Sequence, residues 1–367
     1  MIKDEVTHIV YYMRFLFLEE KKMKKYVSIV LLTLAMLLFA ACANNTASSN
    51  VTEAAKQASA ETKKVFTVGI GQFAEHGSLD NCRIGFIEGM KEEGFIEGDN
   101  VTYPFDNAQT DGSIAAQIYN KFATQKVDMA MAIATPMAQI AYSTFKETDT
   151  PVIFTAVSDP IAAELANSNG TPVGNVTGTS DKLPVEAQLK LITEMFPNAK
   201  RVGILHTSSE VNSDSAIAEY KAIAPKYNVE IVTQSIDQGS DMPLAVDTIL
   251  PKVDVMTNLT DNTVVANMPV LIEKANAMKI PVFGSEIEQV HKGCIAAMGL
   301  DYVELGKQTG HMAAKILKGE KKASEMNFET IVNASLYLNA KVVEDLGLDI
   351  DPSFKEKAVE VFNDIIQ

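Results

Sequence analysis

The chain has 367 residues, and its 32 basic and 47 acidic side chains give a formal net charge of −15. The first 42 residues hold six basic and four acidic side chains, so the remainder carries −17. This acidic balance argues against nucleic acid as a partner, because binding to phosphates requires a basic surface. The length allows two domains of ordinary size.

The N-terminal region contains an uncharged apolar run, residues 26–41, which follows two lysines and leads through small residues into Cys42. The run is shorter than the roughly 20 residues that span a bilayer. A basic start, a short apolar stretch and a small-residue exit are typical of a secretory signal peptide. We expect residues 23–42 to be that peptide. Residues 1–22 then form an extension upstream of the true start at Met23, since two glutamate codons before it can act as a ribosome-binding sequence.

Cys42 carries a further expectation. The stretch "LLFAAC" resembles a bacterial lipobox, in which the cysteine is lipidated and the chain is cut just before it. Phe39 stands where that motif usually has leucine. The resemblance implies an exported protein that is anchored to the membrane by lipid at Cys42; the alternative is an uncleaved helix with a chance cysteine. Residues 43–64 are small and polar, which predicts a flexible tether.

From residue 65 onward, apolar runs alternate with helical patterns. The stretch "KVFTVGIGQF" predicts a buried strand, and the helical spacing after it ends at Gly94. Further strands and helices alternate as far as "TPVIFTAVSDP". Strict alternation with unbroken apolar strands predicts a parallel sheet that is covered by helices on both faces.

The alternation begins again after a segment rich in Gly, Thr and Pro, residues 171–183. Helices predicted over 210–226 and 242–250 separate strands such as "KRVGILHTS" and "VDVMTNLTD". A long helix over 303–318 and a strand around 329–338 complete the pattern. The sequence therefore predicts an α/β fold with two lobes of similar size.

Several kinds of site are disfavoured by the sequence. The glycines of "GIGQF" lack the third glycine of a dinucleotide fingerprint, and no GxSxG elbow is present. The histidines are scattered, so we expect no metal. Cys82 and Cys294 show no disulfide spacing and are predicted to be buried thiols. We expect a binding protein without cofactors and without catalytic activity.

Eight stretches, in order along the chain, resemble the extracytoplasmic receptors of ABC importers, and among them the substrate-binding lipoproteins of the tryptophan/tyrosine type. They are "GIGQFAEHGSLD", "ATPMAQ", "PVIFTAVSDPIAAEL", "GNVTGTSD", "VGILHTSSEVNS", "DNTV", "KIPVFGSE" and "GCIAAMGLDYVELGKQTGHMAAKILKGE". The resemblance implies a type I periplasmic-binding-protein fold with three crossovers. Lobe 1 would comprise residues 65–180 with 301–320, and lobe 2 residues 181–300 with 321–367.

The same resemblance implies the partners. The ligand would be a small molecule, an aromatic amino acid, and the protein partner an ABC permease with its ATPase. The protein would be a monomer that meets the membrane through its lipid alone. Two alternatives stay open: a ligand-sensing lipoprotein that signals through a membrane partner, and the same receptor with a different small-molecule cargo.

Polar residues follow the predicted strands at their carboxyl ends, where parallel α/β sheets bind ligands. The candidates in lobe 1 are Gln72, Phe73, His76, Thr135, Pro136 and Thr155. The candidates in lobe 2 are Glu210, Asn212, Ser213, Asp261, Asn262 and Ser285. Phe73 and His76 are expected to stack against an aromatic side chain.

The remaining candidates suit the two charged groups of an amino acid. Thr135 and Thr155 offer hydroxyls, with helix N–H groups nearby, to a carboxylate. Asp261 or Glu210 can supply the counter-charge for an ammonium group, and we favour Asp261, which ends an apolar strand. The structural alternative is helix capping, for Glu210 and also for Asp159.

Overall fold

The computed structural model describes residues 64–331 and 333–366. The predicted extension, the signal peptide with Cys42, and the tether as far as residue 63 lie outside the described residues. Within the described part, no helix combines the length and the apolar character that a membrane span requires.

The first sheet is parallel at each of its strand pairs. Its order is β12-β6-β5-β4-β1-β2, and β3 also pairs with β1. The strands are β1 (Phe66–Gln72), β2 (Val101–Thr102), β3 (Phe105–Asn107), β4 (Met129–Ile133), β5 (Val152–Thr155), β6 (Val176–Ser180) and β12 (Glu329–Thr330). β4 is buried at every position, as expected for a strand with helices on both sides.

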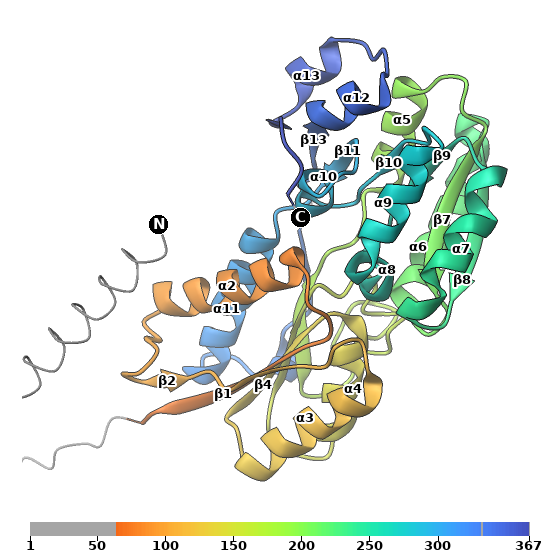
Figure 1. Ribbon diagram of the computed structural model, residues 1–367. Coiled ribbons are helices and arrows are strands. Elements are labelled where there is room, and N and C mark those ends of the chain that lie inside the picture. The colour runs from red at the N-terminus through yellow and green to blue at the C-terminus, as the bar shows by residue number, and fades with distance from the viewer. Residues whose placement is uncertain (1–63, 332, 367) are drawn as a thin grey trace, which may run out of the picture. The chain divides into compact units, whose positions relative to one another are not determined.

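Helices cover both faces of this sheet (Figure 1). α2 (Gly77–Glu92) and α11 (Tyr302–Leu317) lie side by side on one face, and α3 (Gly112–Gln125) and α4 (Thr135–Phe145) lie on the other. α11 comes from far along the chain, so the chain returns to the first sheet after building most of the second lobe.

Glycines set the closeness of α2 and α11. Gly85 and Gly89 of α2 face the backbone of α11, and Gly306 and Gly310 of α11 face the backbone of α2. A Cβ atom at Gly306 would lie 2.2 Å from the carbonyl oxygen of Cys82. Such small residues let two helix backbones touch directly. The helix that follows the second crossover is therefore held firmly on lobe 1.

The second sheet is also parallel and has the order β10-β9-β7-β8. Its strands are β7 (Arg201–Thr207), β8 (Glu230–Ile236), β9 (Val255–Thr257) and β10 (Val282–Phe283). The helices of this lobe are α5 (Val185–Met195), α6 (Val211–Ile223), α7 (Met242–Ile249), α8 (Asn262–Ala266), α9 (Met268–Ala277) and α10 (Ile287–His291). α5 and α6 pack together over one apolar core, and α7 and α9 over another.

The C-terminal part forms a third sheet of β11 (Ala296–Gly299), β13 (Ser335–Asn339) and β14 (Glu360–Phe362), with α12 (Ala340–Leu346) and α13 (Ser353–Lys357). Short 3₁₀ turns complete the elements: η1 (Ala224–Tyr227), η2 (Gly239–Asp241), η3 (Leu250–Lys252) and η4 (Ala323–Glu325).

The single strand expected around 329–338 is two strands, which is a correction to the prediction. β12 pairs with β6 of the first sheet, and β13 pairs antiparallel with β11. β11 leads out of the second lobe and β13 leads back into it, so these neighbours run in opposite directions. The second lobe is therefore not parallel throughout.

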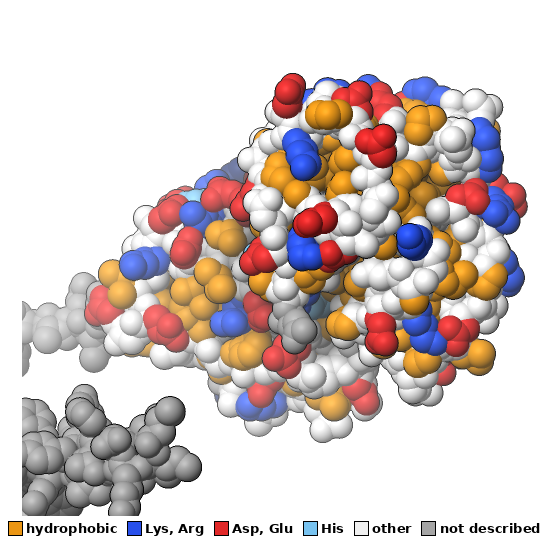
Figure 2. Space-filling model, turned by 45° about the horizontal axis from the view of Figure 1, so that its top comes forward, with side chains coloured by type: hydrophobic (Ala, Val, Ile, Leu, Met, Phe, Trp, Pro, Cys, Tyr) orange, Lys and Arg blue, Asp and Glu red, His pale blue; other side chains and the backbone are white. Residues whose placement is uncertain are grey.

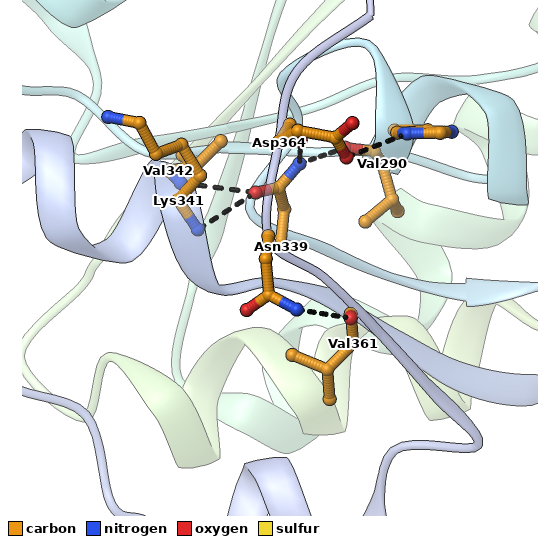
Figure 3. A network of polar contacts seen from close by, with 8 residues as sticks. Val290, Asn339, Lys341, Val342, Val361 and Asp364 are labelled. Carbon is orange, nitrogen blue, oxygen red and sulfur yellow. Dashed lines mark hydrogen bonds and ion pairs between the residues drawn. The ribbon is translucent and has the colours of Figure 1, made fainter.

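Asn339 fastens the C-terminal segment (Figure 3). Its Nδ2 donates to the carbonyl oxygens of Val290 and Asp364, both at 2.9 Å, and its Oδ1 accepts from the backbone N–H groups of Lys341 and Val342. All the hydrogen bonds of this buried amide are used within the protein. One side chain thus caps α12 and holds the last residues of the chain.

The cysteines and the charged side chains were also considered in the sequence. Cys82 and Cys294 are free and buried, which confirms that prediction. On the face drawn in Figure 2, acidic and basic side chains are interspersed. Ion pairs such as Arg201 with Asp254, at 2.8 Å, are partly exposed and contribute little to stability. The fold therefore depends on its apolar cores.

Candidate ligand-binding site

The carboxyl edges of the two parallel sheets lie against each other. Ser158, which follows β5, has its hydroxyl 3.0 Å from that of Thr260, which follows β9. At a second point, the Ser78 hydroxyl in α2 donates to Glu288 of α10 at 3.2 Å. Ligands bind at this edge of parallel α/β sheets, so a site between the lobes is the expected arrangement.

Strained backbone marks the lobe 1 side of this site. Ala134 and Ala156 follow β4 and β5 with φ of 85° and 54°, and Gln109 and Thr110 follow β3 with φ of 53° and 62°. Non-glycine residues in the left-handed region cost on the order of 1–3 kcal/mol each and cluster at functional sites. The sequence shows no signal for this strain.

Two helices of lobe 1 begin at the same edge without a side-chain cap. The N-cap residues of α2 and α4 are His76 and Ala134, and neither side chain bonds its helix. α3, in contrast, is capped by Asp111. Uncapped helix N-termini present free N–H groups that favour an anion, such as the carboxylate of an amino acid.

The predicted residues that follow β1 differ in burial and in how many of their polar atoms have hydrogen-bond partners. Gln72 is fully buried; its Nε2 donates to the Ala74 carbonyl and to Asp80, while no described group donates to its Oε1. Neither ring nitrogen of His76 makes a hydrogen bond of normal geometry with a described residue, although the Asn262 side chain of the second lobe lies near enough to raise its pKa. Burial is the larger effect and lowers the pKa of His76 to about 4, so the ring is neutral at pH 7. Phe73 is buried in the lobe 1 core, and stacking of Phe73 or His76 against a ligand stays a prediction.

The predicted hydroxyl groups also differ. The Oγ1 atom of Thr155 lies 3.1 Å from that of Thr179, which in turn lies 2.7 Å from that of Thr309 in α11. This chain of hydroxyls runs through the interior, so Thr155 is used within lobe 1. Thr135 and Pro136 instead start α4, where the structure leaves the helix uncapped.

Asp261 is saturated by the protein itself. Its carboxylate accepts from the Thr207 N–H at 2.6 Å, the Thr207 hydroxyl at 2.7 Å, the Ser213 hydroxyl at 2.7 Å and the Val264 N–H at 3.0 Å. A carboxylate has about four lone-pair sites. The expected ammonium contact at Asp261 therefore has no acceptor left, and the Ser213 hydroxyl is occupied as well.

Glu210 is likewise engaged, but at a helix other than its own. It accepts from the N–H groups of Asn262 and Thr263 at the start of α8, and from the side-chain amides of Asn262 and Asn212. Burial, followed by the nearby charge of Asp261, raises the pKa of Glu210 to about 8. The capping alternative describes this residue better than a ligand contact.

Two buried acids at the same edges were not among the predicted residues. Asp181 directly follows β6, and its Oδ2 accepts from the Tyr302 hydroxyl at 2.6 Å. Glu286 follows Ser285 after β10, and both accept from Gln289. Both acids end a matched stretch, "GNVTGTSD" and "KIPVFGSE", and this position was the available signal.

A cavity of about 340 Å³ also lies between the lobes, beside the contact of Ser158. Both lobes line it, with Pro160 and Phe328 on one side and Asn212 and Glu219 on the other. Asn212 is the only predicted site residue among its described lining. Asp181 and Glu286 are not among its described lining, although Ser180 and Lys182, the chain neighbours of Asp181, are.

The comparisons with known proteins decide the family. Residues 67–362 match the family model of the ABC transporter substrate binding protein. The chain belongs to this family. Substrate-binding proteins of ABC transporters act outside the cytoplasm and bind small molecules, which confirms the predicted class of receptor.

Individual members of the family are similar over most of the chain. A tyrosine-binding protein of Clostridioides difficile is 36% identical over 328 residues, which cover 89% of this chain and 93% of that protein. A domain from Streptococcus pneumoniae, solved in complex with L-Trp, matches with a TM-score of 0.78 and 33% identity, over 82% of this chain and 100% of that one.

A third relative is the ligand-free, open structure of a substrate-binding protein with adhesive properties from Clostridium difficile. It matches with a TM-score of 0.62 and 36% identity over 81% of this chain and 99% of that one. These structures confirm the predicted α/β architecture of the type I periplasmic-binding proteins.

Proposed function

We propose that this substrate-binding protein captures a free aromatic L-amino acid and delivers it to an ABC permease with its ATPase. The main support for an aromatic amino acid as the ligand is the similarity to a tyrosine-binding protein over 89% of the chain. The match to a domain in complex with L-Trp supports it. The uncapped α2 and α4 suit the carboxylate of such a ligand, and buried acids on both lobes suit its ammonium.

We further propose that capture proceeds by closure of the two lobes. The chain matches the L-Trp complex with a higher TM-score than the ligand-free open structure, although its identity to the open one is higher. The lobe arrangement described here then corresponds to a closed state. The polar contacts between Ser158 and Thr260, and between Ser78 and Glu288, support this assignment. The role is binding, without catalysis.

The proposal includes a lipid anchor at Cys42. Changing Cys42 to alanine removes the thiol that would carry the lipid, so the variant is expected to remain as an unlipidated precursor. Labelling cells with a radioactive fatty acid and comparing the masses of both proteins is the test. A variant that takes up label like the unchanged protein would rule out Cys42 as the anchor.

The cargo is tested by calorimetric titration of the purified protein with each of the twenty amino acids. We expect tryptophan, tyrosine or phenylalanine to bind with the highest affinity. If all three bind no better than millimolar while another solute binds tightly, the cargo proposal is wrong, and the assignment to the receptor family is unaffected.

A further inference from the structure

Three acidic side chains from both lobes gather near the start of α2. Asp181 directly follows β6 at the edge of the first sheet, where the first crossover begins, whereas Glu286 and Glu288 lie after β10 in lobe 2. Asp181 and Glu286 are each 1% exposed, and Glu288 is partly buried. Burial of this degree is rare for a carboxylate without a partner of opposite charge.

The charges of the three acids act on one and the same thiol. Besides burial, the charges of Asp181, Glu286 and Glu288 all raise the pKa of the Cys82 thiol in α2. Besides burial, the charges of Asp181 and Glu286 also raise the pKa of Tyr302, the first residue of α11. Asp181 is hydrogen-bonded to Tyr302 at 2.6 Å, and the charge of Glu286, which comes from the second lobe, acts on the same phenol.

No basic side chain in the described ranges is paired with these acids. The groups that donate to them are neutral: Tyr302 to Asp181, Gln289 to Glu286, and Ser78 and Asn81 to Glu288. Buried carboxylates are normally balanced by a cation. The described residues supply none here, which leaves these acids able to take a cation from outside.

One acceptor in the cluster is open as well. Asp181 Oδ1 makes no hydrogen bond of normal geometry with a described group, although the side chain is almost fully buried and the Ser158 hydroxyl and the N–H of Asp181 itself lie close enough to the carboxyl to lower its pKa. Gln72 Oε1, at the carboxyl end of β1 in the same lobe, is buried and unpartnered in the same way. This contrasts with Asp261, where every lone-pair site is filled.

We propose that Asp181 and Glu286 form the binding site for the ammonium group of the amino-acid ligand. An ammonium has three N–H donors, and the open oxygen of Asp181 together with the Glu286 carboxylate offers acceptors from both lobes. Binding there couples recognition to closure, because the site is complete only when the lobes meet. Glu288 positions this arrangement by bonding Ser78 and Asn81 at the start of α2. This inference rests on the proposed function.

The site also predicts that binding releases a proton. Burial, and then the charge of Glu288, raises the pKa of Glu286 to about 8, and burial raises the pKa of Asp181. Glu286 therefore holds a proton at pH 7 in the described lobe arrangement when no ligand is bound. When a ligand ammonium arrives, the carboxyl gives this proton to the solvent and keeps its negative charge beside the cation.

The neighbouring ionisable groups do not supply that cation. Those that interact with Glu286 are Glu288 on its own helix, Cys82 of α2, Asp181 after β6, Tyr302 of α11 and Cys294 before β11. Asp301, the N-cap residue of α11, and Tyr337 of β13 interact electrostatically with Glu288. Each of these is an acid, a thiol or a phenol.

The test compares ligands with and without an ammonium group. Full-length protein, purified in mild detergent, is titrated with L-tryptophan, L-tyrosine and L-phenylalanine, and with the three corresponding propionic acids, which lack the amino group. Asp181→Asn and Glu286→Gln are expected to weaken amino-acid binding by about 30-fold to 1,000-fold. The same variants should change binding of the propionic acids far less. Asp254→Asn is the matched control, since Asp254 precedes β9 and lies at the opposite edge of its sheet.

Proton release is the second measurement, and it needs no variant. The binding enthalpies of the wild-type protein in phosphate and in Tris at pH 7 should differ by the amount that corresponds to the release of close to one proton. The difference should be smaller for Glu286→Gln. Variants that bind amino acids as the wild type does, or wild-type binding without proton release, would overturn the assignment and leave the proposed function standing. Wild-type protein that binds none of the three amino acids overturns both.

Discussion

At the scale of single residues, acids in similar positions have different tasks. Asp261 and Asp181 both follow strands at the ligand edge, and both are buried. The first accepts four hydrogen bonds, and the second keeps one oxygen open. Saturation of the lone pairs, rather than position, therefore separates a structural acid from a candidate ligand contact.

Asp261→Asn is predicted to lower stability more than affinity. The amide cannot accept all four hydrogen bonds, and loss of bonds to a charged group costs about 1.5–3 kcal/mol. Urea unfolding of both proteins measures the loss, and titration of the folded variant with the best aromatic ligand should give nearly the wild-type affinity. Unchanged stability with a large loss of affinity would instead make Asp261 the ammonium partner.

The buried glutamates predict how the stability of the ligand-free protein depends on pH. The pKa values of Glu210 and Glu286 are raised to about 8, so the folded state binds more protons than the unfolded state between pH 4.5 and 8. Their contribution to stability is present below pH 4.5 and is lost as pH rises through 8. His76 acts in the opposite direction, but only between about pH 4 and 6.5.

We therefore expect the melting temperature of the ligand-free protein to fall from pH 6.5 to pH 8.5. Replacement of both glutamates by glutamine should flatten that dependence. A melting temperature that rises over this range would contradict the protonation assigned to these acids.

Only part of the site could be predicted from its residues. Strand ends followed by polar residues identified the loops at the ligand edge, including those of Thr135 and His76. Hydrogen-bond saturation could not be predicted, because three of the four donors to Asp261 come from β7 and α6, far away in the chain. Asp181 and Glu286 were not among the chosen contacts, because the sequence does not show which of the acids at strand ends keep an acceptor open.

At the scale of elements, the contact of α2 with α11 is the tightest constraint. Gly306→Ala would place a methyl group 2.2 Å from the Cys82 carbonyl oxygen, so the helices must separate. Overpacking of this kind costs about 1–3 kcal/mol, although alanine itself favours a helix by up to about 1 kcal/mol. Gly112→Ala in α3 is the control, because its nearest neighbour would be 3.9 Å away. Equal stability of the two variants would contradict the close packing.

The clamp of Asn339 is a second test of an element contact (Figure 3). Asn339→Ala removes the cap of α12 and the donors to two carbonyl groups, which should cost about 1–3 kcal/mol. Hydrogen exchange is expected to accelerate over residues 359–366. Asn363→Ala serves as the control, since its amide makes one bond of 3.3 Å to Val361. The same exchange rates in both variants would show that Asn339 does not hold this segment.

The elements themselves were largely predictable, because apolar runs and helical spacing alternate clearly from residue 65 onward. The division of 329–338 between two sheets was not, since β12 has only two residues and its partner β6 lies about 150 positions earlier. The antiparallel pairing of β11 with β13 also follows from the path of the crossovers, which local sequence does not record.

At the scale of the whole molecule, the crossover segments that bend when the lobes close lie next to the ligand-binding edge. Asp181 lies in the first crossover and Tyr302 at the end of the second, and their side chains are hydrogen-bonded at 2.6 Å. An ammonium at Asp181 would thus be bound next to the segments that must bend. Binding then stabilises the closed arrangement by mass action, as expected for a ligand that prefers one of two states.

The central claim is that an aromatic amino acid is captured by closure of the two lobes. Small-angle X-ray scattering of the purified protein, with and without saturating L-tryptophan, L-tyrosine or L-phenylalanine, tests it most directly. We predict a smaller radius of gyration with the ligand that binds, and no change with L-lysine. A protein that binds an aromatic amino acid without any compaction would contradict the closure mechanism, and compaction with L-lysine but none of the three would contradict the cargo.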